Sequence, residues 1–306
     1  MNFAANFRRF RASSARNRNS RERGWALISV LWGMSMLSLM AAATMALTVT
    51  SYRGEKHAFA RAEADALLDA GVNAAVLAVS TNALNQRWRV DGVPQRYVFE
   101  GHTFQIAVQD EFGRIDLNMA DITVLQGALR GAGADAHMAE VLADRISDWR
   151  GASENLHRLK GAIDDDYAAA GLSYRPRHGP FQSVDEVQLV LGMTPQLFAK
   201  LKPALTVYSG APSIDTSTAP REALLALYGD HPETVDAIIA ARDGGNLPDG
   251  VILNTLHGQI DPTVPLAGRA FTITVRTNVG GRTFTRVTTV RLTGDRERPY
   301  LVLAWR

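Results

Sequence analysis

The chain contains no cysteine, so disulfide bonds, thiolate metal sites and cysteine nucleophiles are excluded. It also lacks a nucleophile elbow of the form Gly-x-Ser-x-Gly and a glycine-rich loop that could bind phosphate. Its seven histidines are scattered, and no pair has the spacing of metal ligands on one helix. Because no catalytic constellation is present, we predict that the protein is not an enzyme.

Basic residues do not dominate the chain beyond its amino terminus. The formal net charge is +2 and the pI is about 9.0. Residues 1–24, however, contain seven arginines and one acid, which leaves 26 basic and 30 acidic side chains for the rest. A surface that follows nucleic-acid phosphates needs clustered lysine and arginine. We therefore expect no nucleic-acid partner.

One long apolar run follows the arginine-rich segment. The 26 residues from Trp25 to Thr50 include no charged residue and no proline. As a helix they would extend about 39 Å, more than the roughly 30 Å of a bilayer's hydrocarbon core. The positive-inside rule places the arginine-rich flank in the cytoplasm. We expect a single membrane-spanning helix, with residues 51–306 on the opposite side of the membrane.

The junction before this run resembles the class III signal of type IV prepilins and pseudopilins. The sequence reads Arg-Glu-Arg-Gly and then turns apolar, whereas an ordinary secretory signal has a shorter apolar region followed by a small-residue cleavage site. In the prepilin family a membrane peptidase cuts after the glycine, and the new amino terminus is methylated. The resemblance implies that Gly24 ends a cytoplasmic leader and that Trp25 is the first mature residue.

The fifth mature position differs from most members of that family. They carry a glutamate there, whose carboxylate is thought to meet the amino terminus of a neighbouring subunit, since an unpaired carboxylate in lipid is costly. This chain has Ser29 instead. The resemblance therefore points to the minor pseudopilin that usually lacks the glutamate because it lies at the filament tip.

The apolar helix is predicted to continue beyond the membrane. From Tyr52 to about Asn85 the sequence is rich in alanine and contains no proline. Apolar residues recur at helical spacing, which predicts an amphipathic continuation of the membrane helix; they are Phe59, Ala62, Ala66, Leu67, Ala70, Ala74 and Leu77.

Strand-like alternation appears on both sides of a helical middle. It covers residues 96–98, 103–108, 270–277, 283–293 and 300–305, with a hairpin turn at Val279-Gly280-Gly281. We therefore expect an α+β fold, in which a long pilin-like helix, membrane-spanning in its first half, packs on an antiparallel sheet. A large α-helical domain would be inserted in the sheet.

The helical middle contains an internal repeat. Arg114–Leu125 aligns with Ser213–Leu224 at a constant offset of 99, which matches Asp116 with Asp215. Each copy has a polar residue that can cap a helix, and each is followed by a helix that ends in arginine. We interpret the duplication as structural.

Phe181–Val207 resembles a helix-hairpin-helix unit. Two short helices are expected to flank Leu191-Gly192-Met193, with Gly192 at the turn and Thr194 capping the second helix. Because this motif often binds DNA backbones, the alternative function is a membrane-anchored DNA-binding protein of an uptake system. The mildly acidic folded part favours a scaffold role.

The stretch DEFGRIDLNMA at Asp110–Ala120 is similar to a signature of the K-type minor pseudopilins of type II secretion, the general secretion pathway protein K family. The matching residues are Asp110, Glu111, Gly113, Ile115, Asp116, Asn118, Asp148, Trp149, Arg150 and Gly192. The resemblance implies a subunit of the inner membrane and periplasm that initiates or caps the pseudopilus. It implies the I and J minor pseudopilins and the prepilin peptidase as partners.

The resemblance also implies bound calcium, which prefers several oxygen ligands. The candidate ligands are Asp148, Asp164, Asp165 and Asp166. This chain has Gly151 and Ile163 where the family commonly has acids, and a solvated acidic loop is the alternative interpretation.

The expected organisation has five parts. They are a leader at 1–24, a membrane helix at 25–50, the first part of the head at 51–112, the inserted helical domain at 113–245 and the carboxyl-terminal strands at 246–306.

Overall fold

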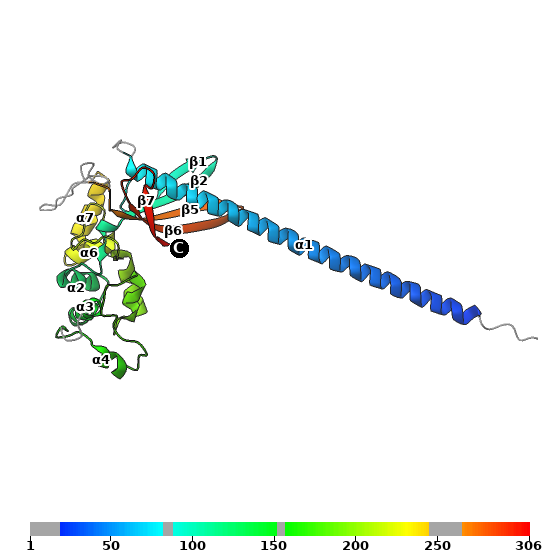
Figure 1. The fold of residues 1–306 in the computed structure, drawn as a ribbon, viewed down its shortest axis with the longest axis horizontal. Coiled ribbons are helices and arrows are strands. Elements are labelled where there is room, and N and C mark those ends of the chain that lie inside the picture. Colours follow the sequence, from blue (N-terminus) through cyan, green and yellow to red (C-terminus); the bar gives the residue numbers. More distant parts are fainter. Residues whose placement is uncertain (1–18, 82–87, 152–156, 245–264) are drawn as a thin grey trace, which may run out of the picture. The chain divides into compact units, whose positions relative to one another are not determined.

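The computed structural model describes residues 19–81, 88–151, 157–244 and 265–306. Most of the predicted leader, residues 1–18, lies outside the described residues. The chain divides into two units, residues 1–62 and 63–306, and helix α1 (Asn19–Ser80) contributes to both. Figure 1 shows the order of the elements along the chain.

The first unit consists of the amino-terminal part of α1. Within it, Trp25–Ala46 is the one helical stretch of the described residues that is long and apolar enough to cross a membrane, with a mean hydropathy of 1.8. None of its side chains is buried. The stretch lies inside the predicted span, Trp25–Thr50.

The second unit contains a five-stranded antiparallel sheet in the order β1-β2-β5-β6-β7. The strands are β1 (Gln95–Phe99), β2 (His102–Asp110), β5 (Ala270–Val279), β6 (Arg282–Leu292) and β7 (Tyr300–Trp305). Gly280 and Gly281 form the two-residue β5–β6 turn, both with positive φ, as type I′ hairpins require. The predicted strands are thus confirmed, and the sheet is interrupted in sequence between β2 and β5.

The carboxyl-terminal part of α1 packs on one face of this sheet. Leu68, Val72 and Val76 are buried in a hydrophobic cluster with Phe104 and Ile273 and their neighbours on the strands. Gly71 permits the approach, since a Cβ there would lie 2.6 Å from a Val275 methyl. A long helix packed on an antiparallel sheet was predicted correctly.

The predicted apolar face of α1 is only partly buried: Leu67 packs against the sheet cluster, but the two ends of the predicted face do not. Phe59 and Leu77 are each 73% exposed. The helix is rich in small alanines, so two faces are compatible with burial. The one that presents Leu68, Val72, Val76 and Val79 is the one that the sheet covers.

Polar contacts also join α1 to the sheet. The Arg286 guanidinium on β6 donates to the carboxylates of Asp65 (2.8 Å) and Asp69, and it lies 4.6 Å from the centre of the Trp305 ring. The Tyr300 hydroxyl donates to Asn73 Oδ1 at 2.9 Å. These contacts tie the helix to the two carboxyl-terminal strands.

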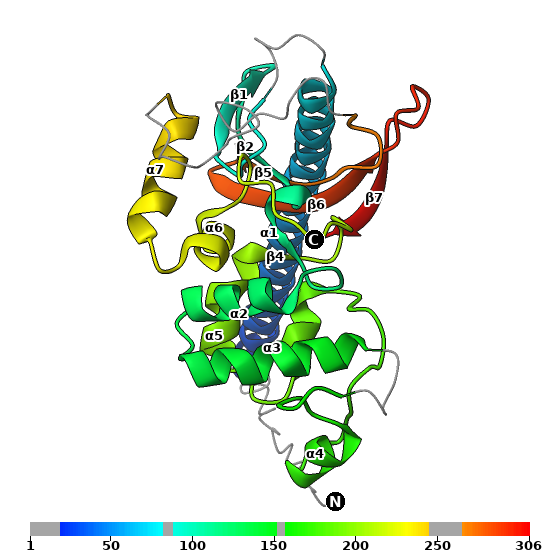
Figure 2. The same ribbon diagram turned by 90° about the vertical axis from the view of Figure 1, so that its left-hand side faces the viewer.

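Between β2 and β5 the chain forms a set of short helices with a hydrophobic core of its own (Figure 2). The elements are η2 (Glu111–Gly113), β3 (Ile115–Asp116), α2 (Ile122–Gly131), α3 (Ala136–Arg150), α4 (Asp164–Ala169), η3 (Val184–Leu189), α5 (Pro195–Leu201), η4 (Lys202–Ala204), β4 (Leu205–Thr206), α6 (Arg221–Tyr228) and α7 (Pro232–Arg242). We refer to residues 111–243 as the insert. Strands β3 and β4 pair in parallel as a separate two-stranded sheet.

The insert contains the internal repeat. Helices α2 and α6 begin at residues 122 and 221, an offset of 99. The turn before each helix has the same hydrogen bond, from the Asn118 amide to Asp116 and from the Ser217 amide to Asp215.

The arginine that ends the second helix of each copy has a matching role. Arg150 Nη1 donates to the Leu117 carbonyl at 2.6 Å, and Arg242 Nη2 donates to the Thr216 carbonyl at 2.5 Å. These two carbonyls are again 99 positions apart.

The predicted helix-hairpin-helix segment is only partly as expected. Gly192 makes the turn with φ of +88°, and Thr194 Oγ1 caps α5 by accepting from the Leu197 amide. The first helix, η3, is a 3₁₀ helix, and helix-hairpin-helix repeats are not confirmed.

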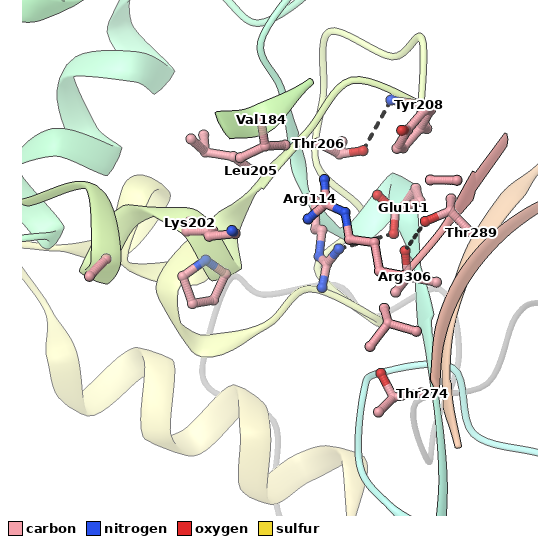
Figure 3. Close-up of a pocket in the computed structure, with 15 residues that line it drawn as sticks. Glu111, Arg114, Val184, Lys202, Leu205, Thr206, Tyr208, Thr274, Thr289 and Arg306 are labelled. Carbon is pink, nitrogen blue, oxygen red and sulfur yellow. Dashed lines mark hydrogen bonds and ion pairs between the residues drawn. The ribbon is translucent and has the colours of Figure 1, made fainter. Parts of the chain in front are cut away.

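A cavity of about 310 Å³ lies between the insert and the sheet face opposite α1 (Figure 3). Phe271 and Ile273 pack toward α1, so the alternating residues Thr272 and Thr274 face the cavity. The insert and α1 therefore cover opposite faces of the sheet.

Candidate functional site

The residues of the predicted processing site lie in helix α1. Gly24 and Trp25 are both helical, and Trp25 is 78% exposed. Ser29 is exposed, and its hydroxyl donates to the Ala26 carbonyl at 2.9 Å. The backbone of the helix thus satisfies the Ser29 hydroxyl.

The motif that follows β2 joins the sheet to the insert. Asp110, fully buried at the end of β2, accepts from the Phe112 amide at 3.0 Å and from Arg269, which precedes β5. Arg269 lies 3.5 Å from Asp215 and 4.5 Å from the Phe112 ring centre. Burial raises the pKa of the Asp110 carboxyl to about 6, although Arg269 opposes the rise.

The structure also explains the motif residues Glu111 and Gly113. The buried carboxylate of Glu111 pairs with Arg114 at 3.1 Å. Gly113 packs against the turn of the second repeat, where a Cβ would come within 2.6 Å of the Thr218 carbonyl. A side chain at this position would separate the two copies.

Ile115 and Asp116 hold the start of the first repeat. Ile115 is buried and pairs with Leu205 of β4. The Asp116 carboxylate is also buried, and it accepts from the Gly210 amide at 2.8 Å and from the Ser209 hydroxyl at 3.1 Å. Asp116 therefore fixes the chain that leaves β4.

The remaining motif residues connect separate parts of the insert. The Asn118 side chain exchanges two hydrogen bonds with the Phe181 backbone, at 2.7 and 3.0 Å. The Trp149 ring stacks on the Phe181 ring with centroids 6.0 Å apart. Arg150 also donates to the Ala120 carbonyl at 2.7 Å, and Arg145 reaches the Leu191 carbonyl beside Gly192.

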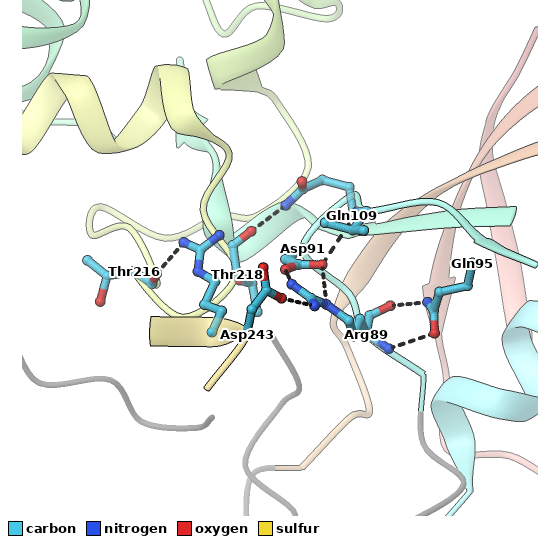
Figure 4. A network of polar contacts seen from close by, with 9 residues as sticks. Arg89, Asp91, Gln95, Gln109, Thr216, Thr218 and Asp243 are labelled. Atoms are coloured by element: carbon cyan, nitrogen blue, oxygen red, sulfur yellow. Dashed lines mark hydrogen bonds and ion pairs between the residues drawn. The ribbon is translucent and has the colours of Figure 1, made fainter. Parts of the chain in front are cut away.

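A second polar network was not identified from the sequence (Figure 4). Arg89, before β1, pairs with Asp91 at 2.5 Å and with Asp243 at the end of α7. Gln109 Nε2 donates to the Thr218 carbonyl at 2.8 Å. This network joins the edge of the sheet to the second repeat. No local pattern marks these residues, because their partners are distant in sequence.

The candidate calcium ligands are engaged separately. Both Asp148 oxygens accept from the Arg158 amide, at 3.0 and 3.2 Å, and burial raises the pKa of this carboxyl. Asp164 binds His178 Nε2 at 2.9 Å, and that hydrogen bond lowers the pKa of Asp164. Asp166 accepts from the Ile163 amide at 2.9 Å, and Asp165 is exposed.

These four carboxylates do not form a calcium site in the described part of the chain. No group of three histidine, aspartate or glutamate side chains there is placed to hold a metal ion. Calcium usually takes six to eight oxygen ligands. The geometry of the described residues therefore does not fit the ion that the resemblance implies.

The fold combines a long amino-terminal helix with an antiparallel sheet and a helical insert; the first part of the helix is apolar, and its last part packs on the sheet. Residues 108–210 match the family model for type II secretion system (T2SS) protein K. The type II secretion system protein K of Pseudomonas aeruginosa is 24% identical over 152 residues, which cover 47% of this chain and 45% of that protein. The match thus spans less than half of that relative.

The fold is similar to that of a solved chain. It aligns with a chain from the crystal structure of the GspK–GspI–GspJ complex of the enterotoxigenic Escherichia coli type 2 secretion system, with a TM-score of 0.55 and 16% identity. The alignment covers 84% of this chain and 98% of that chain. The family model and the Pseudomonas aeruginosa relative agree with the resemblance stated from the sequence, and the solved chain has a similar fold.

The comparisons do not support the DNA-binding alternative. The family that they identify is a structural component of a secretion system. Among the described residues one helical stretch is long and apolar enough to span a membrane, which suits single-pass anchoring.

Proposed function

We propose that this protein is a minor pseudopilin of type II secretion that lies at the tip of the pseudopilus and initiates or caps its assembly. The observation that best supports this proposal is that the two parts of α1 differ in burial. Trp25–Ala46 is apolar yet wholly exposed, whereas Leu68–Val79 supplies the buried face against the sheet. The first part needs lipid or other helices around it, because exposed apolar surface of this extent is costly in water.

The position of Ser29 supports a place at the tip. A glutamate at the fifth mature position would need a cation from the next subunit, since an unpaired carboxylate in lipid is costly. Ser29 bonds within its own helix. A subunit that nothing follows is the one that can dispense with the glutamate.

The proposed topology follows from charge and length. The arginine-rich residues 1–24 would remain in the cytoplasm, and α1 would cross the inner membrane once. The head and the insert would lie in the periplasm. The proposed domain boundaries are those predicted from the sequence, with an inserted helical domain at 113–245 between the two parts of the head.

The proposed role is structural and not enzymatic, and its partners are assembly partners. The Escherichia coli relative was solved in complex with GspI and GspJ. We propose the corresponding I and J minor pseudopilins as partners of this chain and the prepilin peptidase as the enzyme that processes it after Gly24.

Processing at Gly24 tests this proposal. Gly24→Leu should block cleavage, so that the full chain keeps the leader in cells that contain an active prepilin peptidase. Intact mass spectrometry would then show a mature chain that begins at Trp25 for the wild type and for the control variant, but not for Gly24→Leu. Gly33→Leu is a matched control, since nothing lies within 4 Å of a Cβ at Gly33. An unprocessed wild-type chain would overturn the proposal.

A further inference from the structure

The cavity between the insert and the sheet plays no part in the proposed function. Its volume is about 310 Å³, at the small end of ligand sites in proteins. One wall comes from the insert, through η2, η4 and β4, and the other from strands β5, β6 and β7. The site therefore depends on how the whole second unit folds.

Three basic side chains from separate segments point into this cavity (Figure 3). Arg114 follows η2, Lys202 begins η4 and Arg306 follows β7. The Arg306 backbone carbonyl is already used, since it accepts from the Val287 amide at 3.0 Å. Like charges that converge in a partly enclosed space repel one another, unless an anion lies between them.

The acids near the cavity balance only part of this charge. Glu111 pairs with Arg114 at 3.1 Å, and its side chain is buried. The Asp185 carboxylate, on η3, forms ion pairs with both Lys202, at 2.6 Å, and Arg306, at 3.2 Å. One side-chain carboxylate is thus shared between two cations.

The cations stay accessible to a ligand. The side chains of Lys202 and Arg306 are 44% and 55% exposed. Lys202 is also held over the Phe198 ring, 5.5 Å from its centre, which limits its freedom. A fixed but accessible ammonium loses little entropy when it binds an anion.

The other residues that line the cavity determine which chemical group can accompany the anion. Val184, Pro203, Leu205 and Val287 give the cavity an apolar side. Thr272 and Thr289 bond to each other at 2.9 Å across neighbouring strands. A ligand that combines one negative charge with a small aliphatic group matches both parts of the lining.

We infer that this cavity binds a carboxylate of a peptide chain, either a chain terminus or an acidic side chain, next to an aliphatic residue. The carboxylate would interact with Lys202 and Arg306, and the aliphatic group would contact Leu205 and Val287. The inference does not depend on the role in secretion, because it rests on the side chains of the cavity alone.

Isothermal titration of the full chain in detergent tests this inference with three peptides. N-acetyl-Gly-Leu has a free terminal carboxylate, its amide is the neutral counterpart, and N-acetyl-Leu-Glu-amide has a side-chain carboxylate. We expect at least one carboxylate peptide to bind at least tenfold more tightly than the neutral amide. The one that binds more tightly identifies the source of the carboxylate.

Two lysines two positions apart provide a matched pair of variants. Lys202 lines this cavity, whereas Lys200 lines a different one. Lys202→Met should weaken binding at least fivefold, and Lys200→Met should leave it unchanged. Arg306→Met serves as a second cavity variant, and an unchanged melting temperature would show that each variant is folded.

Several results would overturn the inference. Equal binding of the neutral amide would show that charge is not recognised, and no binding of either carboxylate at millimolar concentration would exclude the site. Equal loss in the Lys200 and Lys202 variants would place binding elsewhere. Tighter binding of inorganic phosphate would show a general anion site instead of a carboxylate site.

Discussion

Gly127 and Ala226 occupy the same position in the two copies of the internal repeat, and they pack directly against each other. They are 99 positions apart in sequence, and a Cβ on Gly127 would overlap the Ala226 carbonyl. Helices α2 and α6 therefore cross where Gly127 leaves no room for a larger residue. The repeat is the means by which the two halves of the insert pack together.

Gly127→Ala should destabilise the insert, because the added methyl group must separate α2 from α6. Overpacking of this kind typically costs about 1–3 kcal/mol. Thermal unfolding of the full chain in detergent, followed by circular dichroism, would measure the loss. Gly179→Ala is the control, since the nearest atom to its Cβ is 3.9 Å away. Equal melting temperatures for the two variants would contradict the tight crossing.

The buried Asp110 predicts a specific dependence on pH. Burial raises its pKa from 3.8 to about 6 in the folded protein. The folded state thus holds a proton more tightly than the unfolded state. The stability from Asp110 is fully present below pH 3.8 and is lost as pH rises through about 6.

Comparison with Asp110→Asn isolates this effect, because the amide cannot titrate. The free energy of unfolding of the wild type, relative to the variant, should fall between pH 4 and 7 by about 3 kcal/mol at most. Denaturant unfolding at several pH values measures the difference. Arg269→Gln removes the cation that opposes the shift, so it should move the midpoint to higher pH. A flat difference would refute the assignment.

Asp148 should stabilise the protein without calcium. Its carboxylate is occupied by the Arg158 amide, so Asp148→Asn should cost about 1–3 kcal/mol. The same loss is expected in a chelator and in millimolar calcium, as measured by thermal unfolding. Asp165→Asn, at an exposed position, should change little. A loss that appears only with calcium would show instead that Asp148 is a metal ligand.

A carboxylate at position 29 should impair assembly. Ser29→Glu places an acid near one end of the apolar stretch, and at the proposed tip position no further subunit would pair with it, so the unpaired carboxylate would be costly in lipid. Secretion of an exported protein should fall several-fold, whereas Ser29→Ala should behave as wild type. Improved secretion with the glutamate would argue that another subunit follows this one.

Most of the fold could be predicted because its signals are local. Alternation marks the strands, two glycines mark the β5–β6 turn, and the absence of breakers marks α1. The buried face of α1 could not be predicted from the helix alone. It depends on Val275, which meets Gly71 from a strand about 200 positions later.

The residues of the site could be predicted from the sequence, but their contacts could not. Resemblance identified Asp110 and Asn118, but their partners Arg269 and Phe181 lie 159 and 63 positions away. No pattern in a single sequence reveals such pairs. The cavity was missed for the same reason, because its three cations come from three separate segments.

Co-purification tests the central claim most directly. The full chain, expressed with the I and J minor pseudopilins encoded by the same organism and extracted in mild detergent, should elute with both as one complex. A Gly113→Leu variant, in which the insert cannot pack normally against Thr218, would show whether the complex depends on the intact fold. If the wild-type chain is folded and elutes without either subunit, the claim that it is a K-type minor pseudopilin is contradicted.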